Sequence, residues 1–195
     1  MAQTQLFTEL DQAKREKVFL AAKELFSRFG FKKTTVDEIA DWAGISKRTM
    51  YEVFNSKEEI LAELVMFEAL TFRRHCKKEI KSLADMQDEL RVFCVLWRDY
   101  FEDNKFLQQV LSDEMGMFSP FLKNEIDLVE HGMKDMISKL LLEGMQKGAF
   151  RPLDLPSTVE CILTLLRRYT LAGTEQQSTD VNTEWINFIV NAVKA

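Results

Sequence analysis

The sequence predicts an all-α protein of about nine helices, with a small N-terminal three-helix domain (1–57) followed by a larger helical domain (58–195). Three prolines and seven glycines in 195 residues leave long stretches without a helix breaker. Apolar residues recur at helical spacing along most of the chain. Capping signals divide the N-terminal part into short segments that follow one another closely.

The first helix is predicted over 14–29. Its apolar residues fall on one face at helical spacing, and charged residues lie between them. Gly30 follows at the position where a left-handed residue commonly closes a helix. Lys32 and Lys33 come directly after this glycine and form a basic corner.

Two short helices are predicted next. Thr35 and Glu38 have the spacing of a capping box that opens the second helix, which is not expected to continue past Gly44. Ser46 can cap a third helix, whose pattern ends at Asn55. Three helices therefore fit into the N-terminal domain.

The rest of the chain predicts longer helices. Their ranges are 58–82, 87–102, 105–117, 120–147, 156–171 and 181–193. The segment 90–97, LRVFCVLW, has only Arg91 as a polar member, so neighbouring helices are expected to enclose it on nearly all sides. We expect this segment to form the centre of the second domain.

Several protein classes receive no support from the sequence. No stretch approaches the roughly 20 apolar residues that span a membrane, and the N-terminus lacks signal-peptide features, so we expect a cytoplasmic protein without a membrane partner. Cys76, Cys94 and Cys161 lie far apart without CxxC spacing. His75 and Cys76 are neighbours that diverge by about 100° on a helix. We expect no metal, no cofactor and no enzymatic activity, because no catalytic group has an identifiable partner.

Charge is distributed unevenly. The formal net charge is −5, which by itself weakly disfavours a nucleic-acid partner. Residues 1–60 hold 10 Lys+Arg and 10 Asp+Glu, whereas residues 61–195 hold 16 and 21, so the whole deficit lies in the larger part. The N-terminal part is neutral and has room for a basic face.

The second and third helices are joined by a tight turn at 43–45. The third helix carries Lys47, Arg48, Thr49 and Tyr51, and a short helix of this kind suits entry into the major groove of double-stranded DNA. The two cations can reach guanine O6 and N7, and the tyrosine can donate to a phosphate.

The opposite side of the third helix is apolar. Ile45, Met50 and Phe54 are expected to face the first two helices and to hold the third in place. From these residues alone, a small helical bundle whose polar face is only solvated is the alternative interpretation.

The stretch TTVDEIADWAGISKRTMYEVFNSKEEIL (34–61) resembles the helix-turn-helix of the TetR/AcrR regulators. The preceding AAKELFSRFGF also resembles the helix before it, and the match covers about residues 14–65. The resemblance implies a DNA-binding transcriptional regulator, most readily a ligand-responsive repressor that binds a palindromic operator as a homodimer.

The resemblance also implies roles for individual residues. DNA contacts are expected from Thr35, Ser46, Lys47, Arg48, Thr49, Tyr51 and Lys57, with the first and last of these on phosphates. Glu52 and Val53 depart from the family pattern, in which aromatic, histidine or basic residues are frequent. One or two usual phosphate contacts are therefore expected to be missing or repelled.

The resemblance places dimerisation and ligand binding in the second domain. The apolar helices 156–171 and 181–193 are expected to form a four-helix interface between two copies, with Ile162, Leu166, Tyr169, Trp185 and Ile189. The alternative is that these faces close the monomer's own core. A pocket for a small, largely apolar effector is expected among Phe67, Phe72, Phe93, Trp97, Tyr100, Phe106 and Met133, although most such residues are core.

A second class of function fits the same helices. The acidic balance and Glu52 are compatible with a helical ligand-binding or scaffold protein whose helix-turn-helix does not read DNA. Retention of DNA fragments at low salt distinguishes the two hypotheses.

Overall fold

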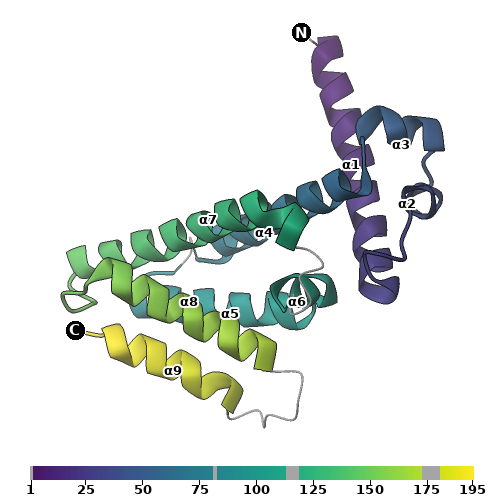
Figure 1. Cartoon of the computed structure of the whole chain (residues 1–195). Coiled ribbons are helices and arrows are strands. Elements are labelled where there is room, and N and C mark those ends of the chain that lie inside the picture. Colours follow the sequence, from purple (N-terminus) through teal and green to yellow (C-terminus); the bar gives the residue numbers. More distant parts are fainter. Residues whose placement is uncertain (1, 81–82, 113–118, 173–180) are drawn as a thin grey trace. The chain divides into compact units, whose positions relative to one another are not determined.

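A computed structural model of the chain describes residues 2–80, 83–112, 119–172 and 181–195 (Figure 1). These residues form α1 (Ala2–Phe29), α2 (Val36–Ala43), α3 (Lys47–Val53), α4 (Lys57–Ile80), α5 (Met86–Glu102), α6 (Lys105–Leu111), α7 (Ser119–Gln146), α8 (Leu155–Ala172) and α9 (Val181–Val193). The predicted all-α class is confirmed. In the described part of the chain, no helix is apolar over a length that could cross a membrane.

The chain divides into two compact units. The first unit runs to Glu68 and includes the start of α7 as far as Glu125, and the second unit contains Ala69–Ser112 and everything from Ile126 onward. Helices α4 and α7 therefore each begin in the first unit and continue in the second. The first unit extends beyond the boundary at residue 57 that the sequence predicts.

Side chains of α1 explain why the start of α4 belongs to the first unit. The ammonium of Lys23 donates to both carboxylate oxygens of Glu68, at 3.0 and 3.1 Å. Arg15 forms an ion pair with Glu63, which also lies on α4. These pairs join elements distant in sequence, and local patterns do not reveal them.

The core of the first unit forms where α1 packs against α2 and α2 against α3. Phe26, Ile39, Met50 and Phe54 are all at most 1% exposed. Burying each such side chain contributes about 1.5–3 kcal/mol relative to leaving it in water. Met50 and Phe54 are buried as predicted, and the Phe54 ring lies 6.1 Å from that of Phe19 on α1, whereas Ile45 is only half-buried.

Two helix ends differ from the sequence prediction. Helix α1 begins at Ala2 instead of residue 14, and no glycine or proline occurs before Gly30 to stop it. Helix α6 ends at Leu111, with Ser112 at its C-cap. The remainder of the predicted segment 105–117 lies outside the described residues.

Helix α5 is the centre of the second unit, as the sequence predicts. It contacts α6, α8 and α9 (Figure 1). Leu90, Phe93 and Trp97 are at most 4% exposed, whereas the apolar residues at 92, 95 and 96 are half-buried, so the segment is enclosed on one face and not on nearly all sides. The polar exception, Arg91, donates through Nη1 to Oδ1 of Asn187 on α9 at 2.5 Å, so it is bound at the edge of the core.

An ion-pair network joins α7 to α8 in the second unit. Glu130 accepts from Nη2 of Arg167 at 2.7 Å and from Nζ of Lys134 at 2.8 Å. Hydrogen bonds from Lys134 and then Arg167 lower the pKa of Glu130 from its ordinary 4.5 to about 2. The charged form of this carboxyl is therefore favoured in the folded chain.

This network predicts a specific pH dependence of stability. Because the pKa of Glu130 is lower in the folded chain, its contribution is present above pH 4.5 and is lost as pH falls toward 2. We expect Glu130→Gln to reduce the free energy of unfolding by about 1 kcal/mol near neutral pH, since the network is partly exposed, and by less in acid. Urea unfolding at several pH values measures this difference. Asp135→Asn on the exposed side of α7 is the control, and an equal loss in both variants at every pH would contradict the assignment.

Candidate nucleic-acid interface

Local capping positions the turn between α2 and α3. The hydroxyl of Thr35 accepts from the backbone N–H of Glu38 at 3.2 Å, and the carboxylate of Glu38 accepts from the backbone N–H of Thr35 at 2.8 Å. The predicted capping box is therefore confirmed. Gly44 ends α2 with a φ of 65°, in the left-handed region that glycine adopts most readily.

Helix α3 is held by its cap and by its apolar side. The hydroxyl of Ser46 accepts from the backbone N–H of Thr49 at 3.1 Å. Met50 and Phe54 are buried, and the guanidinium of Arg15 lies 5.0 Å from the centre of the Phe54 ring. A helix of seven residues is too short to be stable alone, so these contacts define its orientation.

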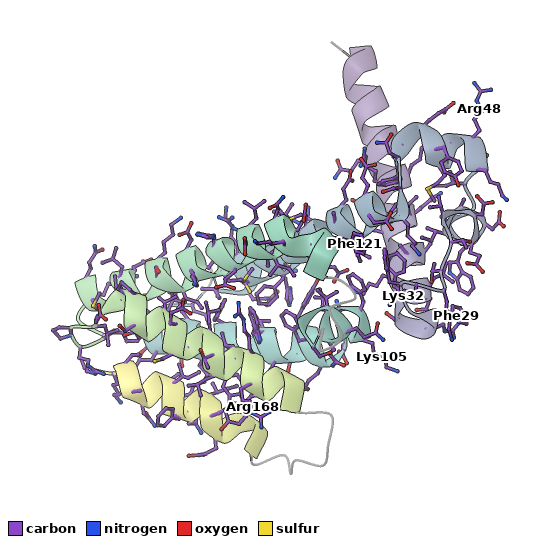
Figure 2. All side chains as sticks on the ribbon, in the orientation of Figure 1. Phe29, Lys32, Arg48, Lys105, Phe121 and Arg168 are labelled. Carbon is purple, nitrogen blue, oxygen red and sulfur yellow. The ribbon has the colours of Figure 1, made fainter. Side chains whose placement is uncertain are left out.

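The other side of α3 is open to solvent. The side chains of Lys47 and Arg48 are 57% and 89% exposed, and Tyr51 is 56% exposed. Figure 2 shows Arg48 projecting away from the ribbon. Thr35 and Ser46 are also exposed, whereas Thr49 is half-buried. The contacts of these residues with DNA remain a prediction, but the exposed surface that they require is present.

Both cations of α3 are paired with carboxylates. Lys47 Nζ lies 2.5 Å from Oδ2 of Asp37, and the hydroxyl of Tyr51 donates to Oδ1 of the same carboxylate at 3.4 Å. Arg48 Nε donates to Glu52 at 3.0 Å. The hydrogen bond from Lys47 lowers the pKa of Asp37, and the same bond raises the pKa of Lys47. DNA must therefore replace or share these carboxylate contacts.

Asp37 is a functional candidate that sequence reasoning did not identify. It lies on α2, while its two partners lie ten and fourteen positions later on α3. No local spacing rule connects these positions, because a turn separates the two helices.

Lys57 faces the first unit's own backbone. Its ammonium donates to the carbonyl oxygens of Phe31 and Thr34 at 2.7 and 2.9 Å and lies 4.4 Å from the centre of the Phe31 ring. Two of its three donors are therefore used within the chain. The carbonyl of Thr34 directly precedes Thr35, so Lys57 fixes the backbone that enters α2. Its predicted phosphate contact has at most one donor left.

Acidic residues lie next to the basic corner that was predicted at Lys32 and Lys33. Lys33 lines an open hollow of about 630 Å³ together with Glu38, Asp41 and the exposed aromatic rings of Phe29 and Trp42. Carboxylates share this surface with the lysine, which reduces the local positive potential.

The residues predicted for the dimer interface lie mostly inside the single chain. Ile162, Leu166, Trp185 and Ile189 are at most 4% exposed, and the half-buried ring of Tyr169 stacks on Trp185 at 5.3 Å. The apolar faces of α8 and α9 pack with α5, as the alternative interpretation holds. The outward faces of these helices instead present Cys161, Thr164, Arg168 and Phe188.

The residues predicted for an effector pocket fall into two groups. Phe67 lies in the first unit, where its ring is 5.1 Å from that of Phe19. The others lie in the second unit, where the ring of Phe72 contacts Phe93, Trp97 and Tyr100 with centroids 5.2–6.2 Å apart. Also buried there are Phe106 and Met133. Phe72, Phe93, Trp97 and Tyr100 therefore form a packed aromatic cluster.

Helices α2 and α3 are short and are joined by a tight turn, and α3 is exposed on its polar side and anchored on its apolar side. This arrangement is the one found in the helix-turn-helix class of DNA-binding proteins. Residues 19–64 match the family described as bacterial regulatory proteins, tetR family. The chain is 31% identical over 147 residues to the HTH-type transcriptional repressor KstR2 of Mycolicibacterium smegmatis, covering 72% of this chain and 69% of the relative. The chain belongs to the TetR family of transcriptional regulators.

Other relatives agree with this assignment. The HTH-type transcriptional regulator YhgD of Bacillus subtilis is 27% identical over 162 residues, which cover 77% of this chain and 80% of the relative. The crystal structure of the transcriptional regulator FadR from Bacillus subtilis in complex with stearoyl-CoA has the same fold, with a TM-score of 0.76 and 21% identity. That match covers 92% of this chain and 97% of FadR.

The position of Lys57 generates a test of its structural role. We expect Lys57→Met to lower the free energy of unfolding by about 1.5–3 kcal/mol, because two carbonyl groups lose a charged donor. Urea unfolding followed by circular dichroism measures the change. The matched control is Lys32→Met, since Lys32 is exposed in the same unit, and we expect it to change stability by less than about 0.5 kcal/mol. Equal stability of the two variants would show that the Lys57 ammonium does not hold the turn.

Proposed function

We propose that the chain is a homodimeric, ligand-responsive repressor that inserts one α3 per copy into the DNA major groove. The observation that carries the proposal is the exposed polar face of α3, which the buried Met50 and Phe54 hold outward. Lys47 and Arg48 are assigned to base edges, where their donors match guanine O6 and N7.

The remaining polar residues are assigned to the DNA backbone. Thr35, Ser46, Thr49 and Tyr51 present hydroxyl groups on or next to the exposed side of α2 and α3, and hydroxyls are frequent donors to phosphate. Such contacts set the register of α3 without reading sequence. Lys57 acts chiefly by fixing the backbone before Thr35.

Repression is the regulatory sense that we propose. The identity to KstR2, which is described as a repressor, supports this assignment. A protein that occupies two half-sites can exclude other proteins from the same DNA. A single α3 contacts only a few base pairs, so two copies on a palindromic operator supply the specificity.

A small, largely apolar molecule is the proposed effector. The complex of FadR with stearoyl-CoA, whose acyl chain is apolar, supports an apolar group in the effector, as do the aromatic side chains around Phe72. Since these rings are packed against one another, an effector must displace part of the cluster to bind among them. Stearoyl-CoA and related thioesters are the first compounds to titrate.

Chain continuity offers a route from the effector to DNA. Helices α4 and α7 each pass from the first unit into the second. In the first unit, Lys57 at the start of α4 and Phe121 at the start of α7 both contact Phe31, the latter with ring centroids 5.8 Å apart. An effector that binds one arrangement of α4 and α7 more tightly shifts the backbone before Thr35 and thereby changes DNA affinity.

Dimerisation is assigned to the outward faces of α8 and α9. Phe188 on α9 is 64% exposed, and Thr164 on α8 is also exposed. Two copies related by a two-fold axis can pair these helices as a four-helix bundle. The inward faces, including Leu166 and Trp185, support this surface from within.

The DNA-binding proposal is tested by selection from a random double-stranded library. We expect the wild-type chain to enrich a palindrome and Arg48→Ala to lose a guanine preference of roughly five- to 150-fold at one position of each half-site. Lys105→Ala is the control, because Lys105 is exposed at the start of α6 in the second unit, where Figure 2 labels it. Failure of the wild-type chain to retain any fragment at low salt would instead favour the ligand-binding or scaffold hypothesis.

Phe188, the exposed aromatic residue on the surface assigned to dimerisation, is the place to test that assignment. We expect Phe188→Glu to weaken dimerisation on the order of tenfold or more, since two carboxylates would be brought together across the two-fold axis. Sedimentation velocity over a range of concentrations measures the change. Leu128→Glu on α7 is the control, because Leu128 is 61% exposed and lies outside the assigned surface. A fully dimeric Phe188→Glu variant would rule out this interface.

A further inference from the structure

Glu52 lies one helical turn after Arg48 on α3. The Nε atom of Arg48 donates to Oε1 of Glu52 at 3.0 Å. The two side chains are 89% and 59% exposed, so the pair stands in solvent on the side of α3 assigned to DNA. An acidic residue at this place opposes the binding of DNA phosphates.

The geometry of the pair leaves the end of the guanidinium available. Glu52 engages Nε, which lies on the inner side of the group, and within the described chain Arg48 makes no further hydrogen bond or ion pair. A guanidinium carries five N–H donors in a rigid fork. Its two terminal nitrogens can therefore bind guanine O6 and N7 while Nε stays on the carboxylate.

We propose that Glu52 is a specificity-determining positioning residue, which orients Arg48 for guanine through Nε and weakens binding to DNA that offers only phosphates. The inference rests on the proposed entry of α3 into the major groove. Glu52 then has two separable effects. The orientation of Arg48 depends on an acceptor oxygen at residue 52, whereas the weaker binding to phosphates depends on the negative charge.

The two effects arise from different terms of DNA affinity. Sequence-independent binding is dominated by attraction between cations and phosphates, so a carboxylate on α3 lowers it for every sequence. Specific binding adds the bidentate contact of Arg48, which is favoured when the long side chain is already held in one orientation. Glu52 therefore weakens binding to all DNA and widens the gap between guanine and other bases.

The ion pair of Lys47 differs from that of Arg48 in the helices that it joins. The carboxylate partner of Lys47, Asp37, lies on α2, so that pair also links two helices. Glu52 makes no hydrogen bond or ion pair outside α3 among the described residues, so its substitution leaves the packing of α2 against α3 intact. This makes Glu52 the cleaner site for an experiment.

The experiment uses the full-length chain and the DNA fragments that it selects from a random double-stranded library. Arg48→Ala first identifies the guanine whose preference depends on Arg48. Binding is then measured to that fragment, to the same fragment with 7-deazaguanine at this position, and to an unselected fragment of equal length. The variants are Glu52→Gln, which keeps an acceptor oxygen without charge, and Glu52→Ala, which removes both.

We expect both variants to bind the unselected fragment about two- to tenfold more tightly, since each removes a negative charge near phosphates. We expect Glu52→Ala to reduce the preference for guanine over 7-deazaguanine by about fivefold or more, and Glu52→Gln to reduce it less. Asp41→Asn is the matched control, because it removes an exposed carboxylate from α2 and is expected to leave the preference unchanged. Thermal unfolding confirms that each variant is folded.

Two failures are distinguishable. If Arg48→Ala changes no base preference, or the wild-type chain selects no fragment, the proposed role of α3 is wrong. If Arg48→Ala removes a guanine preference while Glu52→Ala strengthens binding to all fragments equally, Glu52 only repels phosphates and the positioning role is wrong.

Discussion

The DNA-binding surface depends on one packing constraint: α3 must bury its apolar side against α1 and α2 while its polar side stays in solvent. Met50 and Phe54 satisfy the first condition, and the exposure of Arg48 satisfies the second. Seven residues cannot maintain a helix in water without such contacts. The direction of every proposed base contact therefore follows from these two buried side chains and from the cap at Ser46.

Carboxylates on α2 and α3 reduce the positive charge of the exposed side of α3. Asp37 and Glu52 compensate the two cations of α3, and the N-terminal part of the chain has no net positive charge. Strong binding to arbitrary DNA is disfavoured by this balance, because sequence-independent affinity depends on cations near phosphates. A regulator that must ignore most of a genome benefits from such compensation, since specificity is a difference between two affinities.

Local signals in the sequence were sufficient to predict the helices and the turn. The features that the sequence did not predict depend on contacts between residues that lie far apart in the chain. Capping at Thr35 and Ser46 depends on neighbouring residues, so the turn was predictable. The apolar stripes that contain Leu166 on α8 and Trp185 on α9 were also visible, but periodicity does not say whether a stripe meets the same chain or a second copy. The ties of Lys57 to Phe31 and Thr34 join residues more than twenty positions apart, and no local rule reports them.

Lysine footprinting by mass spectrometry tests most directly whether the exposed side of α3 lies against DNA. The chain is acetylated with and without DNA fragments at low salt, and the modification of Lys47 is compared with that of Lys105. Both lysines are exposed in the free chain, so each is open to the reagent. We expect DNA to protect Lys47 and to leave the modification of Lys105 unchanged. Protection confined to the second unit, with Lys47 equally reactive in both samples, would contradict this expectation.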